Sequence, residues 1–280
     1  MNPYTLSDEA LEALLQADAP LGDLTTHGLA IGRARGRMRL TARDAMTVCG
    51  VEEARRMGAL RGLTVSGPAL ESGQALAPGD AIVDFDGDAA ALHLVWKAAQ
   101  TFIESLSGIA TATAALVQAA APDARVACTR KHFPGTKAAA LKAVLCAGAS
   151  AHRHGLSESL LVFPEHRVFL PDADPAGVVA RLAAANPEKR LVVEVTSPEM
   201  ALEWAEAGAD VLQLEKLGPG GVAEVVAGTR HLARPPVIAA AGGITAANAA
   251  AYVAAGAQVL VTSAPYQAPP RDVQVRFSGA

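Results

Sequence analysis

A dense group of cations marks one short segment of a mildly acidic chain. The stretch TRKHFPGTKAAALKAV, residues 129–144, carries basic side chains on either side of a Pro-Gly turn, although the formal net charge of the 280 residues is −4. An isolated Arg-Lys pair is most simply a solvated surface pair. A second basic group, His152-Arg153 in AHRHGL, follows closely. Two such groups favour a ligand that carries carboxylates or phosphates. The cations of the first stretch are Arg130, Lys131, His132, Lys137 and Lys142.

Two carboxylates come at the ends of apolar runs. Glu194 lies within LVVEV, and Glu215 directly follows VLQL. They are either salt-bridge partners of the nearby cations, or groups that hold Mg²⁺ through a diphosphate or stabilise a cationic transition state. The sequence has no His or Cys spacing typical of zinc and no evident Ser-His-Asp order for acyl transfer.

A glycine pair offers a further anion site. Gly242-Gly243 stand between an apolar run and a helix that we expect to start near Thr245. Backbone amides at a helix N-terminus bind phosphate. A tight turn with Thr245 as a simple N-cap explains the same residues, so this site depends on support from the basic groups.

The second half of the chain contains a repeated unit that would place these residues together. Two segments, WAEAGADVLQL and YVAAGAQVLVT, each read as a helix closed by Gly and followed at once by a buried strand. Such repeats predict an incomplete parallel α/β barrel, with a doubly wound open sheet as the alternative. In a barrel, the polar residues would gather at the carboxyl ends of the strands. The expected strands are 126–129, 160–163, 191–195, 211–214, 237–240 and 259–262.

The first half predicts a separate α/β domain. Strand-like runs alternate with turns up to the Asp86-Gly87 turn, and helical spacing follows, with Leu92, Val95, Trp96, Ala99 and Ile103 on one face. We place the boundary after residue 107, with a barrel domain at 108–266 and a C-terminal tail at 267–280.

Composition restricts the class of protein. The charge balance argues against a general nucleic-acid binder. The Ala-rich stretch at 108–121 is too short to span a membrane, and the acidic N-terminus has no signal-peptide pattern. Three dispersed cysteines, Cys49, Cys128 and Cys146, are typical of reduced thiols, so we expect a cytoplasmic protein.

Several motifs together resemble the quinolinate phosphoribosyltransferases, also called carboxylating nicotinate-nucleotide pyrophosphorylases. The segments LGDLTT (21–26), SGIAT (107–111), TRKHFPG (129–135), AHRHGL (151–156) and GGI (242–244) stand in the family's order. The resemblance implies a sandwich domain completed by the C-terminal tail, an incomplete barrel and a homodimer with shared active sites. It also implies a reaction of quinolinate with phosphoribosyl pyrophosphate, which yields nicotinate mononucleotide, pyrophosphate and CO₂ with Mg²⁺.

The resemblance assigns roles to individual residues. Lys131, Glu194 and Glu215 are the expected catalytic residues, and Glu194 and Glu215 the expected Mg²⁺ ligands. The expected substrate-binding residues are Lys97, Thr129, Arg130, Lys131, His152, Arg153, Phe163, Thr196, Lys216, Gly242, Gly243 and Ser263.

The chain departs from the family's pattern at several of these positions. Lys97 stands where the family has an Arg that is supplied to the neighbouring subunit, and Phe163 replaces a Lys. Thr196 replaces a second acid, and Glu215-Lys216 replaces Asp-Asn. These choices resemble a branch associated with molybdenum transport. They leave open a non-catalytic protein that binds an anionic ligand on the same fold, and they predict that quinolinate is a poor substrate.

Overall fold

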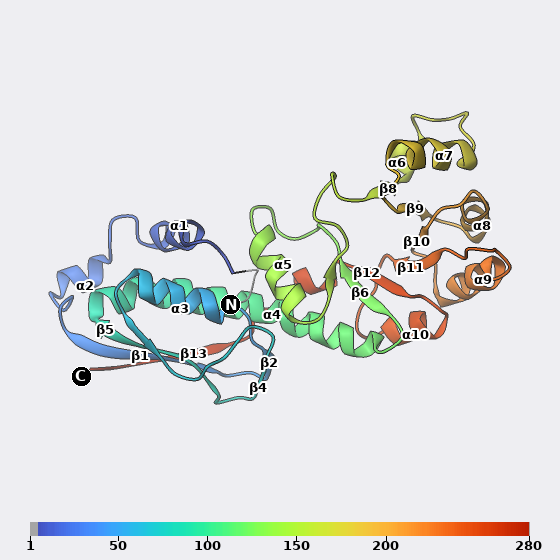
Figure 1. Cartoon of the computed structure of the whole chain (residues 1–280). Helices are drawn as coiled ribbons and strands as arrows, with labels where there is room; N and C mark the ends of the chain where they lie inside the picture. Colours follow the sequence, from blue (N-terminus) through green and yellow to red (C-terminus); the bar gives the residue numbers. More distant parts are fainter. Residues whose placement is uncertain (1–4, 280) are drawn as a thin grey trace. The chain divides into compact units, whose positions relative to one another are not determined.

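The computed structural model describes residues 5–279, and the chain forms two compact units, which are described separately (Figure 1). Unit 1 comprises the described residues up to Ala114, His132–Gly148 and the described residues from Pro265 onward. Unit 2 comprises Ala115–Lys131 and Ala149–Ala264. The units are therefore interleaved along the chain, and the domain limits expected from the sequence stay a prediction.

Unit 1 is built on an antiparallel sheet with the strand order β13-β1-β5-β3. Strand β13 pairs with β1 along its whole length, from Gly279 opposite Gly36 to Val273 opposite Ala42, so the tail contributes an edge strand. Strands β2 and β4 form a separate two-stranded antiparallel sheet. The strands of unit 1 are β1 (Arg35–Ala42), β2 (Met46–Thr47), β3 (Thr64–Ser66), β4 (Ala75–Leu76), β5 (Ala81–Asp88) and β13 (Val273–Gly279).

The helices of unit 1 cover this sheet and enclose its core. Helix α3 packs against α1 and against β3 and β5, and the core is formed by aliphatic side chains and Phe85. The helices are α1 (Asp8–Asp18), α2 (Leu24–Gly28), α3 (Val51–Leu60), α4 (Ala89–Ala120) and α5 (Lys137–Cys146); α4 continues past Ala114 into unit 2.

Helix α4 continues through the domain boundary that the sequence predicts after residue 107. Leu92, Val95, Ala99 and Ile103 are buried on one face, as expected. Gly108 lies within the helix and leaves room for the backbone of the tail: a Cβ on Gly108 would lie 2.3 Å from the carbonyl oxygen of Pro269. By length and composition α4 could cross a membrane, but 39% of its apolar window is buried within the protein, and core helices of soluble proteins pass the same test.

Unit 2 contains a seven-stranded sheet with the order β7-β6-β12-β11-β10-β9-β8, and all its pairs are parallel. The strands follow in sequence around a circle, with β12 paired to β6 and the opening between β7 and β8. This order is an incomplete barrel and not a doubly wound sheet, whose strand order would reverse. The strands are β6 (Arg125–Cys128), β7 (Ser150–Ala151), β8 (Leu160–Val162), β9 (Leu191–Val195), β10 (Val211–Glu215), β11 (Val237–Ala241) and β12 (Val259–Thr262).

The helices of unit 2 connect these strands on the outer side (Figure 1). Gly208 and Gly256 follow the ends of α8 and α10 with φ angles of 94° and 98°. A left-handed residue at this position ends a helix and favours Gly, which explains the two repeated segments in the sequence. The helices are α6 (Pro164–Arg167), α7 (Pro175–Ala185), α8 (Pro198–Glu206), α9 (Pro219–Thr229), α10 (Ala249–Ala254) and, at the boundary of the units, η1 (Ala264–Gln267).

A buried ion cluster joins α3 to α5 within unit 1. Lys142 is fully buried, and its ammonium donates to Glu53 at 2.6 and 2.7 Å and to Glu52 at 2.9 Å. Burial alone would lower the pKa of Lys142, but the bonds to Glu53 and Glu52 outweigh it and raise this pKa. Ser72 donates to Glu52 from its backbone and its hydroxyl, and the pKa of Glu52 is lowered to about 2 although its burial acts in the opposite direction. Lys142 is therefore structural.

Candidate active site

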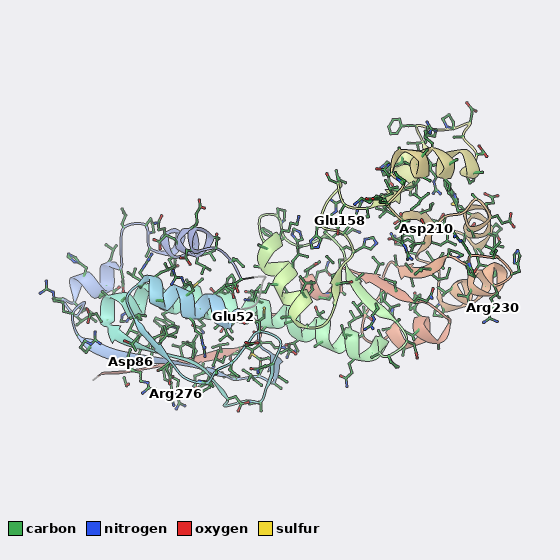
Figure 2. All side chains as sticks on the ribbon, viewed as in Figure 1. Glu52, Asp86, Glu158, Asp210, Arg230 and Arg276 are labelled. Carbon is green, nitrogen blue, oxygen red and sulfur yellow. The ribbon has the colours of Figure 1, made fainter. Side chains whose placement is uncertain are left out.

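Apart from Lys97, every expected site residue lies in unit 2, at or just beyond the carboxyl end of a strand. Figure 2 shows the side chains on the ribbon, with Glu158 labelled on the loop between β7 and β8. The positions follow the strands in order. Thr129, Arg130 and Lys131 follow β6; His152 and Arg153 follow β7; Phe163 follows β8; Glu194 and Thr196 lie on and after β9; Glu215 and Lys216 on and after β10; Gly242 and Gly243 follow β11; and Ser263 follows β12.

Strand register identifies the side chains that face the inside of the barrel. Ala239, Ala241 and Val261 form a cluster with Val211 and Val259 that contains strand residues only. Side chains alternate along a strand, so Gln213 and Glu215 lie on this concave face with Val211. Gln213 is directly opposite Glu194 in the neighbouring strand. Both glutamates therefore line the interior of the barrel near its rim.

The basic side of the site combines exposed and buried cations. Arg130 and Lys131 are exposed, and the Lys131 amide donates to the Thr129 hydroxyl at 3.2 Å. Arg153 is only 7% exposed. Burial, followed by the charge of Arg130, lowers the pKa of Arg153. A nearly buried guanidinium close to a second one is stabilised when an anion lies between them.

His152 responds to the same cations. Burial lowers the pKa of His152 below its ordinary 6.5, the charges of Arg153 and Arg130 lower it further, and Glu158 acts in the opposite direction. His152 is therefore neutral at pH 7, and a bound anion favours its charged form.

We expect binding of pyrophosphate to be coupled to proton uptake by His152. The ligand should raise the depressed pKa of His152, so proton uptake should be largest at a pH between the pKa values of the free and the bound protein. Titration calorimetry over a range of pH, in two buffers with different ionisation enthalpies, measures this uptake. His152→Asn should remove most of the buffer dependence. An equal apparent enthalpy of binding in both buffers for the unsubstituted protein would contradict the prediction.

The acidic side of the site is centred on Glu194. Burial raises the pKa of Glu194, and the charges of Glu215 and Glu165 raise it further. The Gln213 amide donates to Glu194 Oε2 at 2.6 Å and, with the charge of Lys131, opposes this rise. The carboxylates are therefore held close enough to repel one another, which favours a cationic species between them.

The turn after β11 is shaped by a close approach to the end of β10. Lys216 has a φ angle of 57°, unusual for a residue other than Gly, and its amide donates to the Ala241 carbonyl at 2.8 Å. A Cβ on Gly242 would lie 2.6 Å from Cγ of Lys216. The ammonium of Lys216 lies 3.9 Å from Glu215. Gly242 thus lets Lys216 and Glu215 lie against the glycine turn.

The helix expected after this turn begins later than predicted. Helix α10 begins at Ala249, four residues after Thr245. Asn248 accepts from the Thr245 amide at 2.8 Å and donates to the Gly243 carbonyl at 2.9 Å. These bonds make a local turn before the helix, so the prediction of a helix N-terminus directly behind Gly242-Gly243 is wrong.

Phe163 is already engaged by its neighbours. The guanidinium carbon of Arg153 lies 5.3 Å from the centroid of the Phe163 ring, and the His166 ring is stacked with it at 5.9 Å. The Phe163 amide donates to Nδ1 of His166. The aromatic ring therefore stabilises a buried cation, and a ligand that stacks on it would compete with these contacts.

Lys97 lies on α4 in unit 1, away in sequence from the other site residues. Its ammonium lies 4.5 Å from the Trp96 ring centroid and donates to Gln100 at 3.1 Å. Together with Leu14, Phe102 and Ile109 it lines an open, mainly apolar pocket of about 1070 Å³ within unit 1. Its role toward a partner subunit stays a prediction.

Two residues near Glu194 were missed by sequence reasoning. Gln213 interrupts the apolar run VLQL, and its position two residues before Glu215 was the available signal. Arg167 ends the short helix α6 that follows Phe163, and the charge of Glu194 acts to raise the pKa of Arg167. Its guanidinium also donates to the Met200 sulfur at 3.2 Å and lies 5.8 Å from the Trp204 ring centroid.

The grouping of five cations in residues 129–144 as one ligand-binding set is wrong for Lys142. This lysine is fully buried and cannot contact a ligand.

The donor set suits Mg²⁺ in one respect. Glu194 and Glu215 offer carboxylate oxygens on adjacent strands, and Mg²⁺ in phosphate sites commonly uses one or two carboxylates together with phosphate oxygens and water. Among residues 5–279 there is no group of three or more His, Cys, Asp or Glu side chains arranged to hold a metal. A metal here would therefore depend on ligands from the substrate.

Comparison with known proteins places the whole chain in one group. Residues 23–107 match the N-terminal domain of quinolinate phosphoribosyl transferase, and residues 109–276 match its C-terminal domain. A Rhodobacter capsulatus protein named "Putative pyrophosphorylase ModD" is 47% identical over 250 residues, covering 88% of this chain and 96% of the relative. A protein of the same name from Escherichia coli is 38% identical over 279 residues, 98% of each.

Solved structures show the same fold. NadC from Streptococcus pyogenes superposes with a TM-score of 0.89 and 24% identity over 99% of both chains. The nicotinate-nucleotide pyrophosphorylase from Francisella tularensis has a TM-score of 0.87 and 21% identity, covering 96% of this chain and 95% of that one. The sequence matches, over most of the chain, show more than a shared fold: the chain belongs to the quinolinate phosphoribosyl transferase family, whose members are pentosyltransferases.

Proposed function

We propose that the protein transfers the phosphoribosyl group of phosphoribosyl pyrophosphate to a ring nitrogen of quinolinate or a related ring acid, with release of pyrophosphate. One observation carries the proposal. A basic group of Arg130, His152 and Arg153 and an acidic pair of Glu194 and Glu215 end strands of one barrel. The first suits the anionic groups of both substrates, and the second suits the positive charge of a sugar cation.

The cations would act mainly by orientation. Arg130, Lys131 and Arg153 would hold the phosphates and carboxylates, so that the ring nitrogen meets the anomeric carbon in line with the departing pyrophosphate. His152 would gain a proton as the anions bind and add a further charged hydrogen bond.

The carboxylates would act on the transition state. Cleavage of the bond between the anomeric carbon and pyrophosphate develops oxocarbenium character, and Glu194 and Glu215 would stabilise that charge. Glu194 and Glu215 would also hold Mg²⁺, which when bound would neutralise part of the negative charge of pyrophosphate. With quinolinate, the carboxylate beside the nitrogen would leave as CO₂, and the electron pair left on the ring carbon would take a proton.

The second candidate is a binding protein without turnover. Phe163 and Thr196 favour it, because the motifs that the chain resembles have a cation and an acid at these positions. Phosphorus NMR of phosphoribosyl pyrophosphate with a panel of ring acids separates the two. New pyrophosphate supports the enzyme, whereas ligand-induced stabilisation without pyrophosphate supports the binding protein. The cytoplasmic location and the link to molybdenum stay hypotheses.

We expect Arg130→Ala and Lys131→Ala each to weaken binding of phosphoribosyl pyrophosphate by about tenfold, since the loss of an exposed charged contact lies at the lower end of such effects. Calorimetry measures the affinity. Arg190→Ala is the matched control, because Arg190 is exposed at the amino end of β9, opposite the site. Unchanged affinity with a cooperative melt would remove both residues from the site.

We also propose a homodimer in which a partner receives Lys97. The resemblance implies this assembly, and the apolar pocket beside Lys97 is a surface of the kind that subunits bury. Light scattering should give a dimer mass. Lys97→Ala should lower turnover and leave the melting temperature nearly unchanged. A monomer with full affinity for both substrates would contradict the proposal.

A further inference from the structure

The interior of the barrel contains a polar side chain with no obvious reason to be buried. Gln213 is 4% exposed and lies on β10 between the fully buried Leu212 and Leu214. Its amide nitrogen donates to Glu194 Oε2 at 2.6 Å. Its carbonyl oxygen Oε1 is buried and has no hydrogen-bond partner among the described residues. Buried polar groups are nearly always paired, so an unpaired one needs an explanation.

The orientation of the amide follows from Glu194. An ionised carboxylate only accepts hydrogen bonds, so the amide nitrogen must face it and the carbonyl oxygen must point elsewhere. The neighbouring strand on the other side places Ala239 opposite Gln213 and Ala241 opposite Glu215. Neither methyl side chain can donate a hydrogen bond to Oε1. The strands therefore leave one acceptor of the Gln213 amide for a group that the chain itself does not supply.

The chemistry of this acceptor selects among the proposed ligands. Phosphates and ring carboxylates are ionised near neutral pH and accept hydrogen bonds, so Oε1 would repel them. A sugar hydroxyl donates. The other Glu194 oxygen is a second acceptor beside Oε1, and two adjacent acceptors match the two neighbouring hydroxyls of a ribose ring.

We propose that Gln213 is a positioning and recognition residue for the sugar: its amide nitrogen fixes the Glu194 carboxylate, and its carbonyl oxygen accepts a hydrogen bond from a ribose hydroxyl. This inference rests on the proposed function, since it assumes a sugar phosphate at the barrel rim. It assigns the preference for ribose to the inside of the barrel, whereas the basic group at the rim recognises the phosphates.

Sugar phosphates without the leaving group allow a test by binding alone. Ribose 5-phosphate, 2-deoxyribose 5-phosphate and 3-deoxyribose 5-phosphate are titrated into the protein by calorimetry. The protein should bind ribose 5-phosphate about three- to tenfold more tightly than at least one deoxy analogue, as expected for one hydrogen bond to a neutral acceptor. Gln213→Met, of similar length but without an acceptor, should lose this preference and keep its affinity for the deoxy analogue.

Two further variants separate the roles. Both Gln213 variants lose the donor to Glu194 and should lower kcat, but Gln213→Glu retains an acceptor and should therefore keep more of the preference for ribose than Gln213→Met does. Gln258→Met is the matched control: Gln258 is exposed at the amino end of β12, where its side chain accepts from the Ile238 amide. It should retain the preference for ribose.

The outcomes distinguish this inference from the proposed function. If Gln213→Met melts cooperatively and still prefers ribose 5-phosphate as the unsubstituted protein does, the role of Gln213 is overturned while a sugar-phosphate site stands. The role is also overturned if the unsubstituted protein binds all three sugar phosphates equally. If the protein binds none of them and releases no pyrophosphate, the proposed function fails and the inference fails with it.

Discussion

Lys142→Met should lower the free energy of unfolding of unit 1 by about 3–5 kcal/mol, because it leaves buried carboxylates without their cation. Lys142 and Glu53 are both fully buried, and their closest contact is 2.6 Å. Met replaces the apolar stem of the lysine and removes the ammonium alone. The loss should shrink at acidic pH, since carboxylates without a partner are more easily buried when protonated.

Tryptophan fluorescence isolates the unit concerned. The chain has two tryptophans, Trp96 in unit 1 and Trp204 in unit 2. Denaturation in a Trp204→Phe background therefore reports unit 1. Lys137→Met is the matched control, since Lys137 is an exposed lysine of the same helix, and it should change stability by no more than about 0.5 kcal/mol. An equally small effect of Lys142→Met would show that the ion cluster contributes little.

The sequence predicted the barrel because its local signals agree with its topology. Gly208 and Gly256 take a left-handed conformation after helices α8 and α10, and strands β10 and β12 begin three residues later. This regular unit sets the parallel order. The two-residue strand β7 was missed because Ser150-Ala151 is too short to show any pattern. The boundary placed after residue 107 falls inside helix α4, and only the folded chain reveals that the tail occupies the space of a side chain at Gly108.

The site could be predicted where the residue type and its position after a strand indicate a single role. Arg130, His152 and Arg153 were recognised as a group because cations that follow neighbouring strands meet at one edge. Lys142 belongs to the same stretch of sequence but is paired with Glu53, 89 residues earlier. No spacing rule connects these positions. The burial of Gln213 was equally hidden, because a single Gln among Val and Leu residues has the same pattern in an exposed strand.

The largest functional effect is expected at Phe163. The protein should use quinolinate poorly, and Phe163→Lys should improve its use by about ten- to a hundredfold, the gain expected from one charge-assisted contact with a second carboxylate. The motifs that this chain resembles place a Lys here. Pyrophosphate release with quinolinate as acceptor measures the change.

The contacts of Phe163 make the prediction more specific. A Lys at this position would lose the Arg153 guanidinium over the ring, at 5.3 Å, and the stacked His166 ring. It would also add a like charge close to the nearly buried Arg153, whose pKa burial already lowers. The ligand-free variant should therefore melt at a lower temperature than the unsubstituted protein. A dianion between the two cations should offset this loss, so quinolinate should stabilise Phe163→Lys more than it stabilises the unsubstituted protein.

Two comparisons separate charge from shape. Phe163→Leu removes the ring and adds no charge, so it should lower stability without improving the use of quinolinate. A ring acid with one carboxylate should gain less from Phe163→Lys than the dicarboxylate does, because it lacks the second anionic group. If the unsubstituted protein turns over quinolinate as efficiently as an established nicotinate-nucleotide pyrophosphorylase, the idea fails. In that case another cation has replaced the missing lysine, and Arg167, whose pKa the charge of Glu194 acts to raise, is the first to test by substitution.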